Sequence, residues 1–238
     1  MSEKRVAVVT GAGRGIGRAI VRRLAAGGCS VLFTARTAAE LHSLLQELQS
    51  DFPDQFFACE PFDLGSRARA GDFADWIRSN CGGCLHLLVH NAGLFLPGPL
   101  LTGPDDQLST LLQVNVLSAH YLTMDLSDLI TSTPGAHLFF LCSTASLQAY
   151  PAGGAYAVSK HALLGLARSL RLELRPRGVG VTAVLPGPTY TSSWAGSGLP
   201  EERFIKADEV AELIWSAWQV SPSAVVEELL VRPMMGDI

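Results

Sequence analysis

The chain has 238 residues, of which 48% are hydrophobic and 17% charged, and its formal net charge is −4. The negative net charge excludes a protein that binds nucleic acid or anionic membranes through a general positive charge. The length and apolar content suffice for one large α/β domain, so we expect residues 1–238 to form a single domain. No apolar stretch reaches the ~18 residues that a membrane span requires.

The N-terminal segment and the cysteines both predict a cytoplasmic protein. The segment MSEKRVAVVTGAG contains an apolar run too short for a signal peptide, and the five cysteines are an odd number spread along the chain. Cys81 and Cys84 form a C-x-x-C pair, but a second ligand pair for zinc is missing and a strand-like run follows. We therefore interpret the pair as a surface turn and expect no metal site.

Short β-rich runs alternate with helical patterns along the whole chain. The central runs are almost continuously apolar, as expected for a parallel sheet covered on both faces. Such alternation with right-handed crossovers predicts a doubly wound, open α/β fold of the Rossmann type, with about seven parallel strands and helices on both faces. The expected strands are 5–10, 30–35, 55–60, 85–90, 137–142, 179–185 and 224–231, and the expected helices are 15–27, 37–50, 66–79, 105–131, 152–175 and 207–219.

The first strand leads directly into a glycine-rich turn, TGAGRGIG at 10–17, and then into the first helix. Gly11, Gly15 and Gly17 allow a tight turn, close approach of the backbone to a pyrophosphate and close packing of helix on sheet. Arg14 and Ile16 flank the start of a helix that presents unpaired N–H groups to the phosphates. The spacing G-x-x-x-G-x-G departs from the commoner G-x-G-x-x-G, but its place between strand and helix indicates a dinucleotide site.

The end of the second strand indicates which dinucleotide is bound. An NAD site usually has an acid there for the ribose 2′-hydroxyl, whereas this chain reads FTAR at 33–36. Arg36, flanked by Arg14, offers a permanently charged planar fork to a 2′-phosphate, so we expect NADP(H) rather than NAD(H). Asp63, after the third strand, has two interpretations: it accepts a hydrogen bond from the adenine amino group, or it forms a turn.

The least regular stretch of the chain, 186–206, is rich in glycine, proline, serine and threonine and follows the sixth strand. Ligands of doubly wound sheets bind outside the carboxyl ends of the strands, where this segment begins. We interpret 186–206 as a substrate lid, and an ordinary surface loop is the alternative.

Tyr156 and Lys160 lie four residues apart in AYAVSKHALLG, so a helix places both on one face. Such a short pattern also arises by chance, with the tyrosine packed on a neighbour and the lysine extended to water. A free tyrosine has a pKa of about 10 and is a poor acid–base catalyst near neutrality. A nearby ammonium favours the phenolate, so we expect Lys160 to lower the pKa of Tyr156.

Together these motifs resemble the short-chain dehydrogenase/reductase family over nearly the whole chain. Beyond the glycine turn, the matching segments are HNAG at 90–93, Asn115 in LQVNVLSA, Ser143 in LCSTAS, YAVSK at 156–160 and PGPTYT at 186–191. The interval of 13 residues from Ser143 to Tyr156 is the family's usual one. Ordered motifs at family spacing favour the catalytic interpretation of Tyr156 and Lys160.

The resemblance implies a role for each of these residues. Tyr156 supplies a proton, Ser143 hydrogen-bonds the substrate carbonyl oxygen, and Lys160 binds the nicotinamide ribose as part of a proton relay. Asn115 stabilises a helix break and holds a water that links Lys160 to solvent. The positions implied to border NADP(H) are Asn91, Ala92, Gly93, Pro186, Gly187, Thr189 and Thr191, together with the glycine turn, Arg36, Asp63, Tyr156 and Lys160.

Two parts of the chain depart from the common family pattern. His90 replaces the first asparagine of the usual N-N-A-G, a change that we expect to have little effect. The ending VVEELLVRPMMGDI, with PGPTYTSSW before it, is similar to bacterial sepiapterin reductase-like members of the family. On this view Trp194 offers a flat face to a planar substrate and Asp237 pairs with a ring amino group. The alternatives are an ordinary hydrophobic lid residue and a solvated terminal acid.

The sequence thus predicts hydride transfer from NADPH to a ketone or aldehyde, with Tyr156 as general acid. A sepiapterin-type pteridine reductase, a 3-oxoacyl thioester reductase and a non-enzymatic NADP(H)-sensing protein are the alternatives. The expected partner is a small carbonyl compound, without nucleic acid or membrane. By resemblance, we also expect a homodimer or homotetramer formed through helices 105–131 and 152–175.

Overall fold

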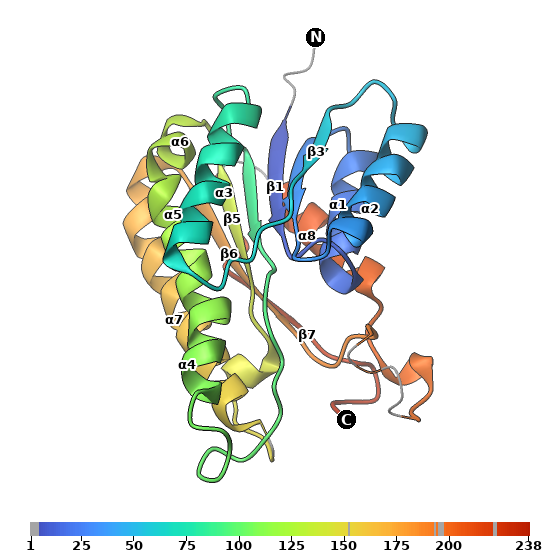
Figure 1. The fold of residues 1–238 in the computed structure, drawn as a ribbon, viewed down its shortest axis with the longest axis vertical. Helices are drawn as coiled ribbons and strands as arrows, with labels where there is room; N and C mark the ends of the chain where they lie inside the picture. Colours follow the sequence, from blue (N-terminus) through green and yellow to red (C-terminus); the bar gives the residue numbers. More distant parts are fainter. Residues whose placement is uncertain (1–4, 152, 193, 195–197, 221–222) are drawn as a thin grey trace.

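Seven parallel strands form one sheet, in which β1 lies between β2 and β4 (Figure 1). The computed structural model describes residues 5–151, 153–192, 194, 198–220 and 223–238. The strands are β1 (Val6–Thr10), β2 (Ser30–Thr34), β3 (Phe57–Cys59), β4 (Leu87–His90), β5 (His137–Leu141), β6 (Gly180–Pro186) and β7 (Glu228–Val231). Their order is β3-β2-β1-β4-β5-β6-β7, and every neighbouring pair is parallel. The direction of winding reverses between β1 and β4, where sheets of this kind bind ligands.

Helices cover both faces of the sheet, with α1, α2 and α8 on one face and α3 to α7 on the other (Figure 1). The helices are α1 (Gly15–Ala26), α2 (Ala38–Asp51), α3 (Arg67–Asn80), α4 (Gln107–Leu112), the π-helical turn η1 (Gln113–Leu117), α5 (Ser118–Asp125), α6 (Ser127–Ser132), α7 (Gly154–Leu174) and α8 (Ala207–Trp218). Short 3₁₀ turns are η2 (Thr144–Ser146), η3 (Arg175–Arg177) and η4 (Glu201–Arg203). In the described ranges, no helix combines the length and the apolar character needed to cross a membrane.

Alternate residues of each strand point to opposite faces and divide the core into two clusters. Val8 and Phe140 belong to the cluster formed with α3, α5 and α7, whereas Val9 and Phe139 belong to the cluster formed with α1, α2 and α8. All four side chains are fully buried. Coverage on both faces explains the continuously apolar runs and confirms the doubly wound fold.

The expectation of one continuous helix over 105–131 is wrong, because the structure divides this segment into α4, η1, α5 and α6. The π-helical turn η1 contains the buried Asn115, whose side chain bonds the backbone of another segment. A second break falls at Leu126, where φ is −103° and ψ is 7°. Buried residues such as Leu122, Leu126 and Ile130 still recur at helical intervals, so the apolar period does not reveal the breaks.

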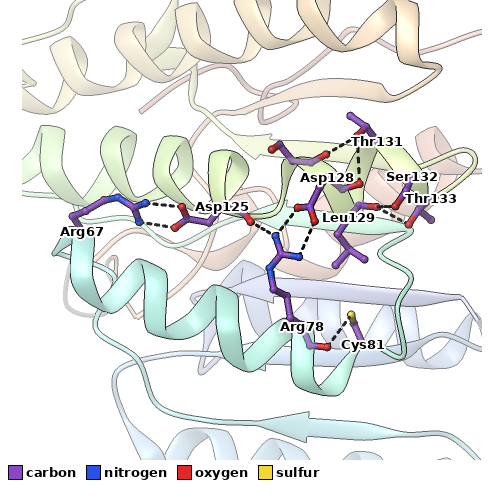
Figure 2. A network of polar contacts seen from close by, with 10 residues as sticks. Arg67, Arg78, Cys81, Asp125, Asp128, Leu129, Thr131, Ser132 and Thr133 are labelled. Carbon is purple, nitrogen blue, oxygen red and sulfur yellow. Dashed lines mark hydrogen bonds and ion pairs between the residues drawn. The ribbon is translucent and has the colours of Figure 1, made fainter.

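Two arginines of α3 connect it to α5 and α6 (Figure 2). Arg67 donates to both carboxylate oxygens of Asp125, at 2.5 and 2.6 Å. Arg78 donates to both carboxylate oxygens of Asp128, at 3.0 and 2.5 Å, and also to the Asp125 carbonyl at 2.5 Å. Because the arginines are exposed to solvent, these contacts orient the helices more than they stabilise them.

The C-x-x-C segment is a turn, as the sequence predicts. Cys81 follows the last residue of α3, and its thiol contacts the Arg78 carbonyl at 3.7 Å. Gly82 and Gly83 come next with φ of 65° and 84°, the left-handed region that glycine adopts readily. All five cysteines are free thiols.

Phe73 provides a test of the core beneath α3. Its fully buried ring lies 5.1 Å from the ring of Phe62 and 5.8 Å from that of Trp76, measured between centroids. We expect Phe73→Ala to lower the free energy of unfolding by about 3–5 kcal/mol, because it removes buried apolar surface and leaves a cavity. Leu172→Ala, at a side chain that is 65% exposed, should change this free energy by less than about 0.5 kcal/mol. Urea titration followed by circular dichroism measures both values, and equal losses would contradict this packing.

Candidate active site

Loops from four neighbouring strands meet at the carboxyl edge of the sheet. β1 runs into Gly11, β4 into Asn91, β5 towards Ser143 and β6 into Gly187. The pairings β1–β4, β4–β5 and β5–β6 bring these loops side by side. One edge of the sheet therefore carries four predicted features: the glycine turn, the HNAG motif at 90–93, Ser143 and the start of the 186–206 segment.

Asn91 connects the end of β4 to the end of β1. Its side-chain amide donates to the carbonyl oxygens of Thr10, at 2.9 Å, and Gly11, at 3.0 Å. In return, the Thr10 hydroxyl accepts hydrogen bonds from the backbone N–H groups of Asn91, at 3.0 Å, and Ala92, at 2.9 Å. Asn91, which the sequence predicts to border the cofactor, thus also fixes the geometry of the glycine turn.

The glycine turn is closed on its inner side. A β-carbon built on Gly17 would collide with the Gly11 carbonyl and the Asn91 amide, and one on Gly11 would lie 2.8 Å from the Ala92 α-carbon. Gly11 and Gly15 have φ of 68° and 55°. These contacts and conformations leave room only for glycine, and they let α1 begin directly against the end of β1.

Two cations and one acid lie near the outer side of the turn. Arg14, at the N-cap of α1, and Arg36, after β2, are both exposed. The carboxylate of Glu40, in the first turn of α2, lies so close to Gly13 that a β-carbon there would collide with it. Glu40 was not among the predicted site residues, since an acid in the first turn of a helix is common for reasons of the helix dipole alone.

Ser143 and Tyr156 come together from β5 and α7. Ser143 is the N-cap of η2, and its hydroxyl accepts a hydrogen bond from the Ala145 N–H at 3.1 Å. The same side chain hydrogen-bonds the Tyr156 phenol, which works to lower the phenol pKa. Burial is the larger effect and raises the pKa of Tyr156 to about 12. At neutral pH the phenol therefore carries its proton.

Lys160 lies one turn after Tyr156 on α7, as the spacing predicts. Its buried ammonium donates to the Leu141 carbonyl at 2.6 Å and lies 5.7 Å from the centroid of the Tyr156 ring. Burial lowers the pKa of Lys160 to about 8. The expectation of a lowered pKa for Tyr156 is wrong, because desolvation of the phenol outweighs the opposing effect of the Ser143 hydrogen bond.

Asn115 holds the loop after β4 against α7. Its Oδ1 accepts from the Leu94 N–H at 2.7 Å, and its Nδ2 donates to the Leu94 carbonyl at 3.0 Å and the Ser159 hydroxyl at 2.9 Å. A β-carbon built on Gly93 would lie 3.2 Å from the Asn115 Oδ1 and 3.8 Å from the Lys160 Nζ. The helix break expected at Asn115 is present as the π-helical turn, and it places this side chain close to Lys160.

The other predicted cofactor residues line the same edge with differing exposure. Asp63 is exposed and accepts a hydrogen bond from the Gly65 N–H at 3.1 Å, which is the turn-forming interpretation. Thr189 is buried, and its hydroxyl donates to the Gly187 carbonyl at 3.0 Å. Thr191 lies against the glycine turn, since its methyl group is 3.0 Å from the position that a β-carbon on Gly15 would take. Pro186 ends β6, and Ile16, in the first turn of α1, is partly buried against the core.

The two predicted substrate residues have partners within the chain. Trp194 packs on the buried Phe204 with ring centroids 5.1 Å apart. Asp237 forms an ion pair with Arg232, and its Oδ1 lies 2.9 Å from the position of a β-carbon on Gly187. Trp194 therefore fits the alternative of a hydrophobic loop residue. Asp237 is paired rather than freely solvated. Residues 193 and 195–197 of the 186–206 segment lie outside the described ranges.

His90 is a buried core residue. Its Nε2 lies 2.9 Å from the Thr123 hydroxyl, and its ring stacks on Phe140 with centroids 4.7 Å apart. Burial lowers the pKa of His90 to about 3, so the imidazole is neutral at physiological pH. The substitution in the N-N-A-G motif is thus accommodated on the core side of the strand, away from Gly11.

The chain belongs to the short chain dehydrogenase family, whose model matches residues 5–201. It is 28% identical to the sepiapterin reductase of Chlorobaculum tepidum, over 99% of this chain and 98% of that protein. It is similar in structure to an alcohol dehydrogenase from the archaeon Thermococcus sibiricus complexed with 5-hydroxy-NADP, with a TM-score of 0.90, 28% identity and coverage of 98% and 97% of the two chains. A metagenomic short-chain oxidoreductase in complex with NADP gives a TM-score of 0.82 at 30% identity, with 97% of each chain covered.

A substitution at Gly17 tests the closed glycine turn. The β-carbon of Gly17→Ala would collide with the Gly11 carbonyl and with the Asn91 amide, which is itself held by two hydrogen bonds. We therefore expect the free energy of unfolding to fall by about 1–3 kcal/mol. Gly165→Ala is the matched control: nothing lies within 4 Å of its β-carbon position on α7, and helix propensity predicts a gain of about 0.5–1 kcal/mol. Thermal unfolding of both variants measures the contrast, and two similar shifts would refute the close approach.

The buried ammonium of Lys160 makes stability depend on pH. The pKa of this group is about 8 in the folded protein against 10.5 in the unfolded chain, so between these values the unfolded chain binds the extra proton and folding becomes more favourable as pH rises. Relative to Lys160→Met, the unfolding free energy of the original protein should increase by up to about 3 kcal/mol across this window. Urea titrations at several pH values measure the difference, and curves that stay parallel would rule out a desolvated cation.

Proposed function

We propose that this protein is an NADPH-dependent carbonyl reductase that converts a ketone or aldehyde to an alcohol. The observation that carries the proposal is the meeting of Ser143, Tyr156 and Lys160 beside the glycine turn, at the carboxyl edge of the sheet. A phenol, a hydroxyl and an ammonium in this arrangement suit a reaction in which negative charge develops on a carbonyl oxygen.

The residues around the glycine turn fit NADP(H). Gly11, Gly15 and Gly17 let the turn pack closely against the loop after β4, so that α1 begins directly after β1 and its first N–H groups can bind phosphate. Arg14 and Arg36 are exposed and can hold the 2′-phosphate, while the position before Arg36 is alanine rather than an acid. When bound, the reduced nicotinamide supplies the hydride for the carbonyl carbon. The complexes of the two structural relatives with 5-hydroxy-NADP and NADP support this choice of cofactor.

In the proposed mechanism, Ser143 donates a hydrogen bond to the substrate carbonyl oxygen and Tyr156 gives that oxygen its proton. The high pKa of Tyr156, about 12, keeps the phenol protonated at neutral pH, the state that a general acid needs for reduction. Lys160, fixed by the Leu141 carbonyl, holds positive charge beside the phenol and stabilises the phenolate left after proton transfer. Asn115 acts as a positioning residue for the loop next to Lys160.

Pteridine reduction is the second candidate. The similarity to the Chlorobaculum tepidum sepiapterin reductase favours it. The Trp194 ring is tilted by 57° to the ring of the buried Phe204, so the two rings do not form one flat face. Against it, Asp237, the predicted anchor for a ring amino group, is already paired with Arg232. A thioester reductase and a non-enzymatic NADP(H) sensor have no observation of this kind in their favour.

Tyr156→Phe tests the proposed function. It removes the proton donor and keeps the ring, so we expect kcat for NADPH-dependent carbonyl reduction to fall by about 10²–10⁴-fold. The dissociation constant for NADPH, measured by fluorescence titration, should change little. The substrate panel contains sepiapterin, an acetoacetyl thioester, a vicinal diketone and an aromatic aldehyde, with NADH as the control. Substantial activity of the variant would remove Tyr156 from this role, and tight NADPH binding without turnover of any substrate would favour the sensor.

A further inference from the structure

Exposed aromatic rings lie beside Tyr156 on two loops. Phe95, from the loop after β4, meets the Tyr156 ring edge to face, with centroids 4.9 Å apart and an interplanar angle of 88°. Tyr150, from the loop after η2, is close enough for Tyr156 to contribute to the raised pKa of its own phenol, after burial. Phe95 and Tyr150, named here the aromatic pair, are 44% and 39% exposed. Large apolar rings that remain exposed beside a reactive group indicate a ligand surface.

Internal contacts hold the aromatic pair in place. The buried Gln107 donates from its Nε2 to the carbonyl oxygens of Leu96, at 3.1 Å, and Pro97, at 3.3 Å, directly after Phe95. The Tyr150 ring lies against Gly153, since a β-carbon there would be 2.6 Å from the ring. The loop that carries Phe95 also rests on the start of α7, where a β-carbon on Gly154 would be 2.6 Å from the Gly98 carbonyl. Both rings are therefore presented by fixed backbone.

The three segments that leave the sheet around Tyr156 carry no charged residue in their sequence. Residues 91–104, 138–159 and 178–200 contain no aspartate, glutamate, lysine or arginine. The first charged residue after 138–159 is Lys160, whose ammonium is bound by the Leu141 carbonyl. The first charged residues after 91–104 are Asp105 and Asp106, which repel an anion. A carboxylate or phosphate of a substrate would thus lose hydration without gaining a cationic partner from these segments.

We propose that the substrate is a neutral aryl ketone or aldehyde whose ring packs against Phe95 and Tyr150 while its carbonyl oxygen meets Tyr156 and Ser143. This inference rests on the proposed carbonyl reductase function and narrows it to one class of substrate. Offset or edge-to-face contacts with the aromatic pair supply the binding energy, and the three uncharged segments offer no cationic partner to an anionic carbonyl compound.

Two aldehydes of nearly the same shape test the charge requirement. p-Isopropylbenzaldehyde and p-carboxybenzaldehyde differ mainly in the charge of the para group, and diacetyl serves as a small carbonyl without a ring. We expect kcat/KM with NADPH to favour the isopropyl compound over the carboxylate by about 10-fold or more. Equal values, or preference for the carboxylate, would overturn the inference. If diacetyl is reduced in a Tyr156-dependent manner at the same time, the proposed function stands; if none of the three is reduced, the proposed function and the inference both fail.

Phe95→Ala tests the aromatic pair. The ring contact is present in the ground state and in the transition state alike, so its loss should raise KM for p-isopropylbenzaldehyde by about 2–10-fold with a smaller change in kcat. KM for diacetyl should change by a smaller factor, and Leu172→Ala, on the exposed part of α7, should alter neither substrate. Because Phe95 is partly exposed, the variant should fold, which its melting temperature checks. Equal changes in KM for both carbonyls, or a change in kcat alone, would overturn the assignment of Phe95 to substrate binding.

Discussion

The side-chain amide of Asn91 joins the ends of two neighbouring parallel strands, and the geometry of the site depends on this contact. The amide bonds the carbonyl oxygens of Thr10 and Gly11, and it fills the space in which residue 17 would otherwise carry a β-carbon. α1 can approach β1 so closely only because Gly17 has no side chain. The glycine turn and the loop after β4 therefore form one unit, from which the chain continues to Leu94 and its bonds with Asn115.

Burial shifts the two central titrating groups of the site in opposite directions. The pKa of the Tyr156 phenol rises to about 12 and that of the Lys160 ammonium falls to about 8, because each loses hydration in its charged form. In the proposed mechanism, the neutral phenol gives up its proton and the desolvated ammonium lies beside the negative charge that remains. The Leu141 carbonyl, at the end of β5, offsets part of the cost of holding that cation inside the protein.

Much of this arrangement follows from the sequence, because strand order and short motifs depend on local patterns. Six of the seven strands lie within the predicted ranges and β6 extends one residue beyond its range, to Pro186. The four-residue spacing of Tyr156 and Lys160 places both on α7. Apolar periodicity alone does not predict the division of 105–131, because buried residues recur at helical intervals on both sides of the breaks, whereas the family resemblance implies the break at Asn115. The approach of Glu40 to Gly13 and the Arg232–Asp237 pair depend on tertiary folding, which periodicity does not encode. The sequence also does not predict the aromatic pair, because nothing in it distinguishes an exposed aromatic residue from a buried one.

The position of β1 between β2 and β4 has a consequence for the order in which the molecule is assembled. Its partner β4 begins at Leu87, and the bonds that complete the glycine turn join residues 81 positions apart. A parallel sheet contains no hairpin that could form early from adjacent segments, so each pairing waits for a complete crossover. During synthesis, the glycine turn therefore acquires its final shape only after Asn91 and Ala92, about 80 positions later in the chain, have been made.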